Sequence, residues 1–249
     1  MNASRFSVIL GFLILFLVYH FPEFFDTFWV SAVFKILFLI IALLIGRVQG
    51  FNGLSGYALR LRESWGTNLL KGLSIGILFF SISIYLSNLL GYTKIYSIEN
   101  FKIILLRLPF LLLVTGIPSL AEDMLTRGYL FTHYRKKLSS KNWIIFSAVI
   151  YTLNHIWRLQ DGIAVSSYLL LFGAVLALIV VRTQSLWLAF GIHWGANLTY
   201  ECSKSVMVID DFSQYDESTW LLALTWLILL IILIVTKKSS RKTYFSKTN

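Results

Sequence analysis

An acidic pair followed by an arginine lies where the chain otherwise carries no charge. The stretch "AEDMLTRGYL", residues 121–130, places Glu122, Asp123 and Arg127 directly after an apolar run. Because a helix turns by roughly 100° per residue, Asp123 and Arg127 share one face and can form an ion pair. Glu122 points roughly 140° away from Arg127 on the same geometry. We therefore expect the pair to support the helix and Glu122 to face a cavity or another helix.

Two further polar groups lie inside apolar runs downstream. The stretch "YTLNHIW" carries Tyr151 and His155, and "GIHWGANLTY" carries His193 and Asn197. His193 and Asn197 are four residues apart, so they lie on one helical face and direct two donors the same way. Small residues around them let a second helix approach closely. These small residues are Gly191, Gly195 and Ala196.

Together these residue types favour hydrolysis of an amide bond. Glu122 with His155 provides a general base for water, and His193 with Asn197 provides oxyanion donors. A serine or cysteine nucleophile is not needed: the chain has no G-x-S-x-G, and Cys202 has no evident base on its face. A single intramembrane histidine or asparagine more often joins helices by hydrogen bonds, but three coincident groups favour chemistry.

A zinc site is the alternative use of these side chains. Glu122, His155 and His193 are ordinary zinc ligands by type, but the sequence has no H-E-x-x-H. We therefore expect no cofactor and keep zinc as the less favoured alternative.

The composition requires that these residues be positioned by membrane helices. The 249 residues are 57% hydrophobic and only 14% charged, with a mean hydropathy of +0.73. Apolar runs predict an all-α, polytopic membrane protein with about eight transmembrane helices. The predicted spans are 6–21, 27–46, 69–91, 102–121, 142–158, 163–181, 185–201 and 218–236. Lys35 and Arg107, which lie within such runs, are expected to snorkel or to pair with lipid phosphate.

The distribution of basic residues predicts the orientation. The formal charge of +10 could suggest nucleic acid, but the basic residues occupy short segments between apolar runs, so we expect no nucleic-acid partner. With a cytoplasmic N-terminus, fifteen basic residues lie on the inner side and four on the outer side, which places both termini in the cytoplasm. The inner set is Arg5, Arg47, Arg60, Arg62, Lys71, Arg135, Lys136, Lys137, Lys141, Arg182, Lys237, Lys238, Arg241, Lys242 and Lys247, and the outer set is Lys94, Lys102, Arg158 and Lys204.

The three polar groups, in this order, resemble the CPBP family of intramembrane proteases. That family includes the CAAX-processing Rce1-type enzymes and bacteriocin-associated Abi proteins, and its pattern is E-E-x-x-x-R, F-x-x-x-H and H-x-x-x-N. Here the matching stretches are "EDMLTR", "YTLNH" and "HWGAN", over about residues 105–200. Asp123 replaces the second glutamate of the pattern, and Tyr151 replaces the phenylalanine.

The resemblance implies an intramembrane endopeptidase. It implies that Glu122, assisted by His155, activates water, that His193 and Asn197 stabilise the oxyanion, and that Asp123 and Arg127 support the motif helix. A membrane-associated peptide or protein is the expected substrate, and a bacterial plasma membrane the expected location. Because the basic stretch "GYLFTHYRKK" follows the first motif, we expect the cavity to open near the cytoplasmic leaflet.

The resemblance also divides the chain into three parts. Residues 1–100 hold N-terminal transmembrane helices, 101–202 form the CPBP/Abi-like catalytic core, and 203–249 hold the last transmembrane helix and a basic cytoplasmic tail. No repeat or linker separates these parts, so we expect one compact helical domain. The stretch "GYALRLRESWGTNLLKGL" predicts either an interfacial helix or a plain connector.

Two other functions are compatible with a polar cavity of this kind. The first is a bacteriocin-immunity or regulatory membrane protein that binds a peptide or partner without cleaving it. The second is a transporter in which the carboxylate and the histidines relay protons. The lack of an inverted repeat and of helix pairs broken by glycine or proline argues against a transporter.

Overall fold

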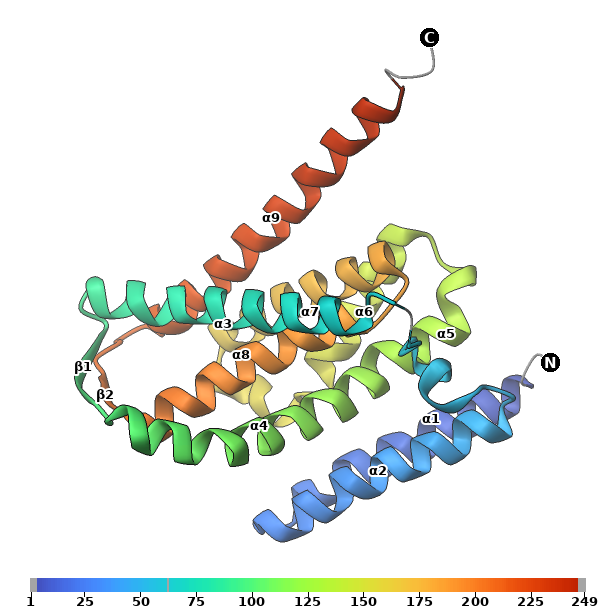
Figure 1. The fold of residues 1–249 in the computed structure, drawn as a ribbon, viewed down its shortest axis with the longest axis horizontal. Helices are drawn as coiled ribbons and strands as arrows, with labels where there is room; N and C mark the ends of the chain where they lie inside the picture. Colours follow the sequence, from blue (N-terminus) through green and yellow to red (C-terminus); the bar gives the residue numbers. More distant parts are fainter. Residues whose placement is uncertain (1–3, 62, 246–249) are drawn as a thin grey trace.

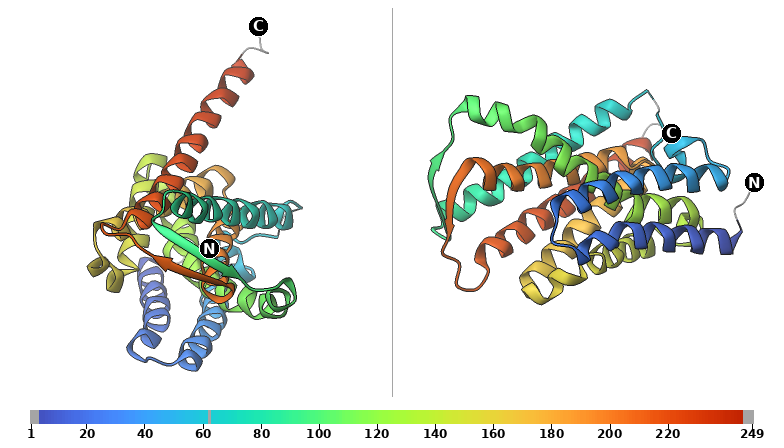
Figure 2. Two further views of the ribbon diagram at one scale, coloured as in Figure 1. Left: turned by 90° about the vertical axis from the view of Figure 1, so that its left-hand side faces the viewer. Right: turned by 90° about the horizontal axis from the view of Figure 1, so that it is seen from below.

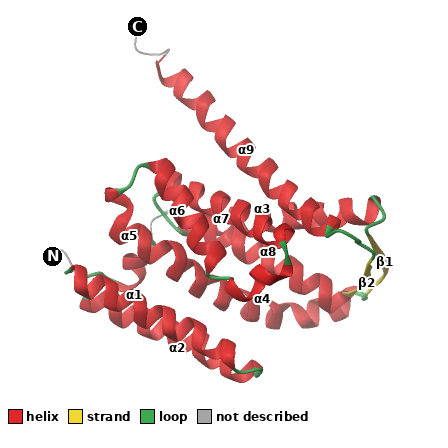
Figure 3. Ribbon diagram, turned by 180° about the vertical axis from the view of Figure 1, so that it is seen from behind, coloured by secondary structure: helices red, strands yellow, loops and turns green. Residues whose placement is uncertain are grey.

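A computed structural model describes residues 4–61 and 63–245 of the chain, with the backbone alone for 237–245. Arg62 and Lys247, which entered the count of basic residues, lie outside the described residues, as do the side chains of Lys237, Lys238, Arg241 and Lys242. The described chain is a bundle of helices with one short ribbon of two strands at one end (Figures 1 and 3).

The first two helices form a hairpin along one side of the bundle. Helix α1 (Arg5–His20) begins at Ser4, whose side chain accepts a hydrogen bond from the Ser7 amide at 3.1 Å, and ends in the 3₁₀ turn η1 (Phe21–Phe24). Helix α2 (Phe28–Val48) returns beside it (Figure 1). Most of the large apolar side chains of this hairpin are exposed, as expected for helices that face lipid.

Helices α3 and α8 make the closest helix pair in the structure. Helix α3 (Trp65–Leu89) packs against α8 (Trp187–Val206) through facing glycines. A Cβ atom placed on Gly76 would lie 2.2 Å from the carbonyl oxygen of Ile192, and one on Gly191 would lie 2.4 Å from that of Leu69. Small residues therefore set the separation of the two backbones, as the sequence around His193 predicted.

The helix that carries the first motif changes its winding at that motif. Helix α4 (Phe101–Asp123) passes through Pro109 and Pro118 and continues without a break as the π-helical turn η3 (Met124–Tyr129). It then continues as α5 (Leu130–Tyr134) and the 3₁₀ turn η4 (Arg135–Lys137). A π turn inside a helix is rare and occurs frequently at functional sites.

Three more helices complete the bundle. Helix α6 (Ser140–Leu153) leads through the 3₁₀ turn η5 (Ile156–Asp161) into α7 (Ile163–Thr183), which is the most buried of the long helices. Helix α9 (Glu217–Phe245) packs against α3 and α7 and then extends away from the bundle toward the C-terminus (Figure 1).

A two-stranded ribbon joins two of the connecting segments. Strand β1 (Thr93–Ile98) pairs antiparallel with β2 (Met207–Asp211), with Ile95 opposite Ile209. The ribbon therefore ties the α3–α4 connection to the α8–α9 connection. It lies at the end of the molecule opposite the two termini (Figures 1 and 2).

The fold confirms the all-α, polytopic prediction and corrects several details. Each of the eight predicted spans contains a helix, and six helices among the described residues are long and apolar enough to cross a membrane. Helix α6 has 14 residues and ends before His155, so the predicted span 142–158 is too long. The stretch 56–73, for which an interfacial helix and a plain connector were both predicted, contains the end of the 3₁₀ turn η2 (Gly53–Tyr57), a non-helical segment in which Arg62 is not described, and the first turns of α3.

Candidate active site

The side chain of Glu122 lies between two histidines, one just after the end of α6 and one within α8. Its Oε1 atom is 3.5 Å from Nε2 of His155, and its Oε2 atom is 3.9 Å from Nε2 of His193. Glu122 is buried, yet it lines a cavity. Residues of all three groups therefore lie around one carboxylate, and Glu122 faces a cavity and other parts of the chain, as its position on the helix led us to expect.

The position of His155 fixes the role of its two ring nitrogens. His155 follows the end of α6, and its Nδ1 atom lies 2.9 Å from the backbone oxygen of Tyr151. Because a carbonyl oxygen only accepts hydrogen bonds, Nδ1 is the donor of this bond. In a neutral ring the lone pair then lies on Nε2, toward Glu122. A water molecule can donate to Nε2 and to Glu122 Oε1 together.

Asp123 connects the first motif to the third. Its carboxylate forms the predicted ion pair with Arg127, and both side chains are fully buried. The Oδ1 atom of Asp123 also lies 3.2 Å from Nδ1 of His193. Asp123 therefore contacts a cation on its own helix and an imidazole on α8, which is a wider contact than the scaffold role expected from the sequence.

Tyr151 forms an aromatic wall beside these groups. The Cζ atom of Arg127 lies 4.3 Å from the centre of the Tyr151 ring, which is within the range of a cation–π contact. The same ring meets the rings of His155 and His193 edge to face, with centroids 4.8 Å and 5.8 Å away. The aromatic ring, which tyrosine shares with the phenylalanine of the family pattern, makes all these contacts.

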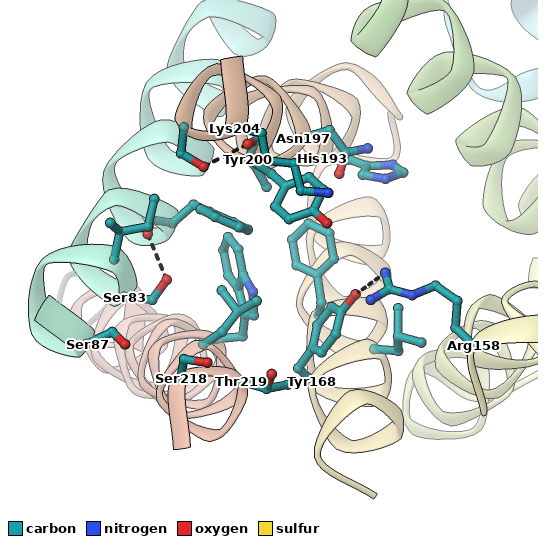
Figure 4. A pocket seen from close by; sticks show the side chains of 18 of the residues that line it. Ser83, Ser87, Arg158, Tyr168, His193, Asn197, Tyr200, Lys204, Ser218 and Thr219 are labelled. Carbon is teal, nitrogen blue, oxygen red and sulfur yellow. Dashed lines mark hydrogen bonds between the residues drawn. The ribbon is translucent and has the colours of Figure 1, made fainter. Parts of the chain in front are cut away.

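Asn197 lies one turn beyond His193 and also lines the cavity. Its Nδ2 atom donates to Ser119 Oγ on α4 at 2.9 Å. This bond orients the amide toward the helix that carries Glu122 and leaves its second N–H free to donate. Figure 4 shows His193, Asn197 and Tyr200 in a row along α8.

Two residues of the N-terminal hairpin reach the site, and sequence reasoning did not select them for it. Tyr19 of α1 donates a hydrogen bond to Glu122 Oε2 at 3.3 Å. Lys35 of α2 donates to the backbone oxygen of Tyr19 at 2.9 Å and lies over its ring. The expectation that Lys35 snorkels to lipid is therefore wrong, because its side chain is buried. The signal in the sequence that could have identified Lys35 was its place as a lysine inside an apolar run.

The cavity has a volume of about 580 Å³ and extends from Glu122 to the β1–β2 ribbon. Its middle is apolar and aromatic, with Phe80, Phe172 and Trp226 on different helices. Its far end is polar and includes Lys204 and Asp211. Figure 4 shows Ser83 and Ser87 of α3, Ser218 and Thr219 of α9, and the hydrogen bond from Arg158 to Tyr168 around this space.

The location of this cavity corrects one expectation. None of its lining residues among the described ones belongs to the basic segment 128–137 that was expected to lie at its opening. Residues of β1, β2 and the start of α9 surround its outer part instead. The cavity therefore opens toward the ribbon and not toward "GYLFTHYRKK".

Residues 104–199 match the sequence model of the family described as "Type II CAAX prenyl endopeptidase Rce1-like". By this match, the segment is similar to a family of CAAX prenyl endopeptidases. The resemblance predicted from the three motifs is thus confirmed, with nearly the same limits. No curated protein and no solved structure matches the chain significantly.

The Rce1-like segment holds all the motif residues but only part of the site. Glu122, His155, His193 and Asn197 lie within it, whereas Tyr19 lies in α1, outside it. The outer part of the cavity, formed by the ribbon and α9, also lies outside. The six long apolar helices among the described residues make the chain a multi-pass membrane protein, and residues 104–199 are similar to a protease family.

The side chains around Glu122 are of types that could hold a metal ion. Within the residues that the structure describes, no group of three histidine, cysteine, aspartate or glutamate side chains is placed to hold a metal ion. Glu122 stands next to His155 and His193, but a shared ion would require their side chains to turn.

Proposed function

We propose that the chain is an intramembrane endopeptidase in which Glu122 activates water. The observation that supports this proposal most directly is the placement of Glu122. One oxygen of its carboxylate faces His155 and the other faces His193, on the wall of a cavity large enough for an extended peptide. A carboxylate beside a histidine with a free lone pair is a suitable base for a water molecule.

The reaction begins when Glu122 takes a proton from water and the hydroxide oxygen attacks the carbonyl carbon of the substrate. The carbonyl π electrons move to its oxygen, which accepts hydrogen bonds from the amide of Asn197 and from His193 in its protonated form. Collapse of this intermediate breaks the carbon–nitrogen bond. The leaving amine takes the proton that Glu122 holds, and the products are a new carboxyl terminus and a new amino terminus.

Asp123 and Tyr19 hold the reacting groups in position. Asp123 lies against His193 from the side opposite to the cavity, and Tyr19 donates to the Glu122 oxygen that faces away from His155. The remaining oxygen, Oε1, has no hydrogen-bond partner among the described residues and is free for water. The substrate we propose is a peptide segment of a membrane-associated protein.

This function is tested by incubating the full chain, purified in lipid nanodiscs, with membrane-associated peptides and identifying products by mass spectrometry. Asn197→Ala should lower cleavage roughly 100- to 1,000-fold, as loss of one oxyanion donor does. His155→Ala and His193→Ala should abolish it. His133→Ala is the matched control, because His133 bonds to Gln49 at 3.1 Å and does not line the cavity. Equal cleavage by all four variants would contradict the proposal, and biological function without cleavage would favour a binding role.

Chelation provides the test of the metal alternative. We propose that the reaction needs no cofactor, and we expect EDTA or phenanthroline to leave cleavage by the purified chain unchanged, because Glu122 itself acts as the base. The measurement is the initial cleavage rate before and after dialysis against chelator. Loss of activity that zinc restores would contradict the glutamate mechanism.

A further inference from the structure

The cavity is bounded by connections that all lie at one end of the bundle, which we call the ribbon end. Trp157 Nε1 donates to Glu23 Oε2 at 2.9 Å, which joins the α6–α7 connection to the α1–α2 connection. The amide of Phe212 donates to the oxygen of Tyr92 at 2.8 Å, which joins the α8–α9 connection to the α3–α4 connection. The ribbon end is thus made of these connections and the helix turns next to them, which are residues 21–27, 90–107, 154–162 and 201–217.

The remaining connections meet at the opposite end, which we call the terminal end. The amide of Leu186, between α7 and α8, donates to the oxygen of Ala58, between α2 and α3, at 3.0 Å. The Trp187 side chain donates to the oxygen of Arg60 at 3.0 Å. Helix α1 begins and α9 ends at this end (Figures 1 and 2). The described residues of the terminal end contribute nothing to the lining of the cavity.

Charge separates the two ends clearly. At the terminal end, nine described basic residues accompany one acidic residue, Glu63. These basic residues are Arg5, Arg47, Arg60, Lys71, Arg135, Lys136, Lys137, Lys141 and Arg182. The ribbon end carries five basic residues, Lys94, Lys102, Arg107, Arg158 and Lys204, and nine acidic ones. The acidic residues are Glu23, Asp26, Glu99, Asp161, Glu201, Asp210, Asp211, Asp216 and Glu217.

An excess of lysine and arginine in short connections marks the cytoplasmic side of a membrane protein. We propose that the ribbon end faces the non-cytoplasmic side, so that the cavity takes its substrate from there. The catalytic part of this inference rests on the proposed function, whereas the orientation does not. The basic connections and the cavity mouth lie at opposite ends, so a cytoplasmic terminal end requires a non-cytoplasmic mouth.

The lining of the cavity indicates which substrate this side would supply. The exposed Lys204 lies at the mouth, with its Nζ atom 4.1 Å from the centre of the Tyr200 ring. Asp211 is engaged locally: its carboxylate accepts hydrogen bonds from the Ser213 amide and the Ser218 hydroxyl, each at 2.8 Å. Apolar residues such as Phe172 follow toward Glu122. The occupant is a peptide segment that emerges at the outer membrane surface, with apolar side chains near the bond to be cut.

The orientation is tested by cysteine labelling of the full chain in intact bacterial cells. Cys202 is first replaced by serine, and single cysteines are introduced as Tyr215→Cys at the ribbon end, Lys204→Cys at the cavity mouth, and Lys136→Cys at the terminal end. Tyr215 is 77% exposed, and Lys136 is also exposed. Size-exclusion chromatography shows whether each variant is folded.

A charged, membrane-impermeant maleimide added to intact cells should react with the cysteines of Tyr215→Cys and Lys204→Cys. These cysteines should then no longer be labelled by a second maleimide that is added later. Lys136→Cys should react only after the cells are permeabilised. Reaction of Lys136→Cys in intact cells, alone or together with Tyr215→Cys, would overturn the proposed orientation. Failure of Lys204→Cys to react even after permeabilisation would overturn the proposal that the cavity is open at Lys204. Labelling needs no cleavage, so a failed orientation and a failed protease function remain distinguishable.

Discussion

Asp123 is the residue at which this chain departs from the acidic pair of the family pattern that it resembles, and its contacts explain what the shorter side chain still does. It pairs with Arg127 within its own helix and lies 3.2 Å from Nδ1 of His193 on α8. The π turn that follows Asp123 alters the path of the backbone between the two paired residues. Aspartate is therefore long enough here to reach both partners.

Asp123→Asn should destabilise the folded chain strongly. The Arg127 side chain is fully buried, and removal of its carboxylate partner leaves a buried charge without compensation, which costs about 3–5 kcal/mol. Thermal unfolding in detergent measures the effect. Asp123→Glu is the matched control, because it keeps the charge, and it should unfold close to the wild type. Equal stability of Asp123→Asn and the wild type would show that the pair does not support the helix.

The sequence predicted pairs of motif residues that share a helical face, but it did not predict that the α1–α2 hairpin contributes a residue to the site. Spacing on one helix identified the pair of Asp123 with Arg127 and the shared face of His193 with Asn197. Spacing carries no information about contacts between residues far apart in the chain. The sequence therefore did not indicate Tyr19, whose hydroxyl donates a hydrogen bond to Glu122 although the two residues are 103 positions apart.

At the scale of elements, the contact between α3 and α8 positions the third motif. Gly76 faces the backbone of Ile192, the residue that precedes His193, so the position of α3 sets the position of the imidazole. The small residues around His193 predicted a close helix contact. These small residues did not identify α3 as the partner helix of α8, because a glycine in an apolar run can equally well face lipid.

Gly76→Ala should lower both stability and cleavage. The added Cβ would lie 2.2 Å from the Ile192 oxygen, so the helices must move apart, at a cost of about 1–3 kcal/mol for overpacking. Gly66→Ala is the control, because nothing lies within 4 Å of the Cβ position there. The melting temperature and the cleavage rate of both variants should be compared. A fully active and stable Gly76→Ala variant would show that this contact does not position His193.

Three local features could not be predicted from apolar runs. The β1–β2 ribbon pairs segments 93–98 and 207–211, and such pairing depends on where the helices bring their ends. The π turn leaves no signal in hydrophobic periodicity, since its residues are all buried. Helix α6 ends at Leu153 although the apolar residues Ile156 and Trp157 follow, and His155 belongs to a different turn.

At the scale of the whole molecule, the cavity and the basic connections lie at opposite ends. The expected cytoplasmic opening rested on sequence proximity, since the basic stretch follows Glu122 closely. In the structure the chain turns away from the cavity after Glu122, and residues of β1, β2 and α9 form the mouth instead. These segments lie outside the Rce1-like segment, so the access route is built from parts of the chain that its motifs do not describe.

The central claim is that the Glu122 carboxylate activates the water that cleaves the substrate. Glu122→Gln tests it most directly, because the change keeps the size of the side chain and the hydrogen bond from Tyr19 while it removes the base. The measurement is the rate of product formation from a membrane-associated peptide in nanodiscs, by mass spectrometry. The account predicts a folded variant with no detectable product. Cleavage by Glu122→Gln at the wild-type rate would contradict it.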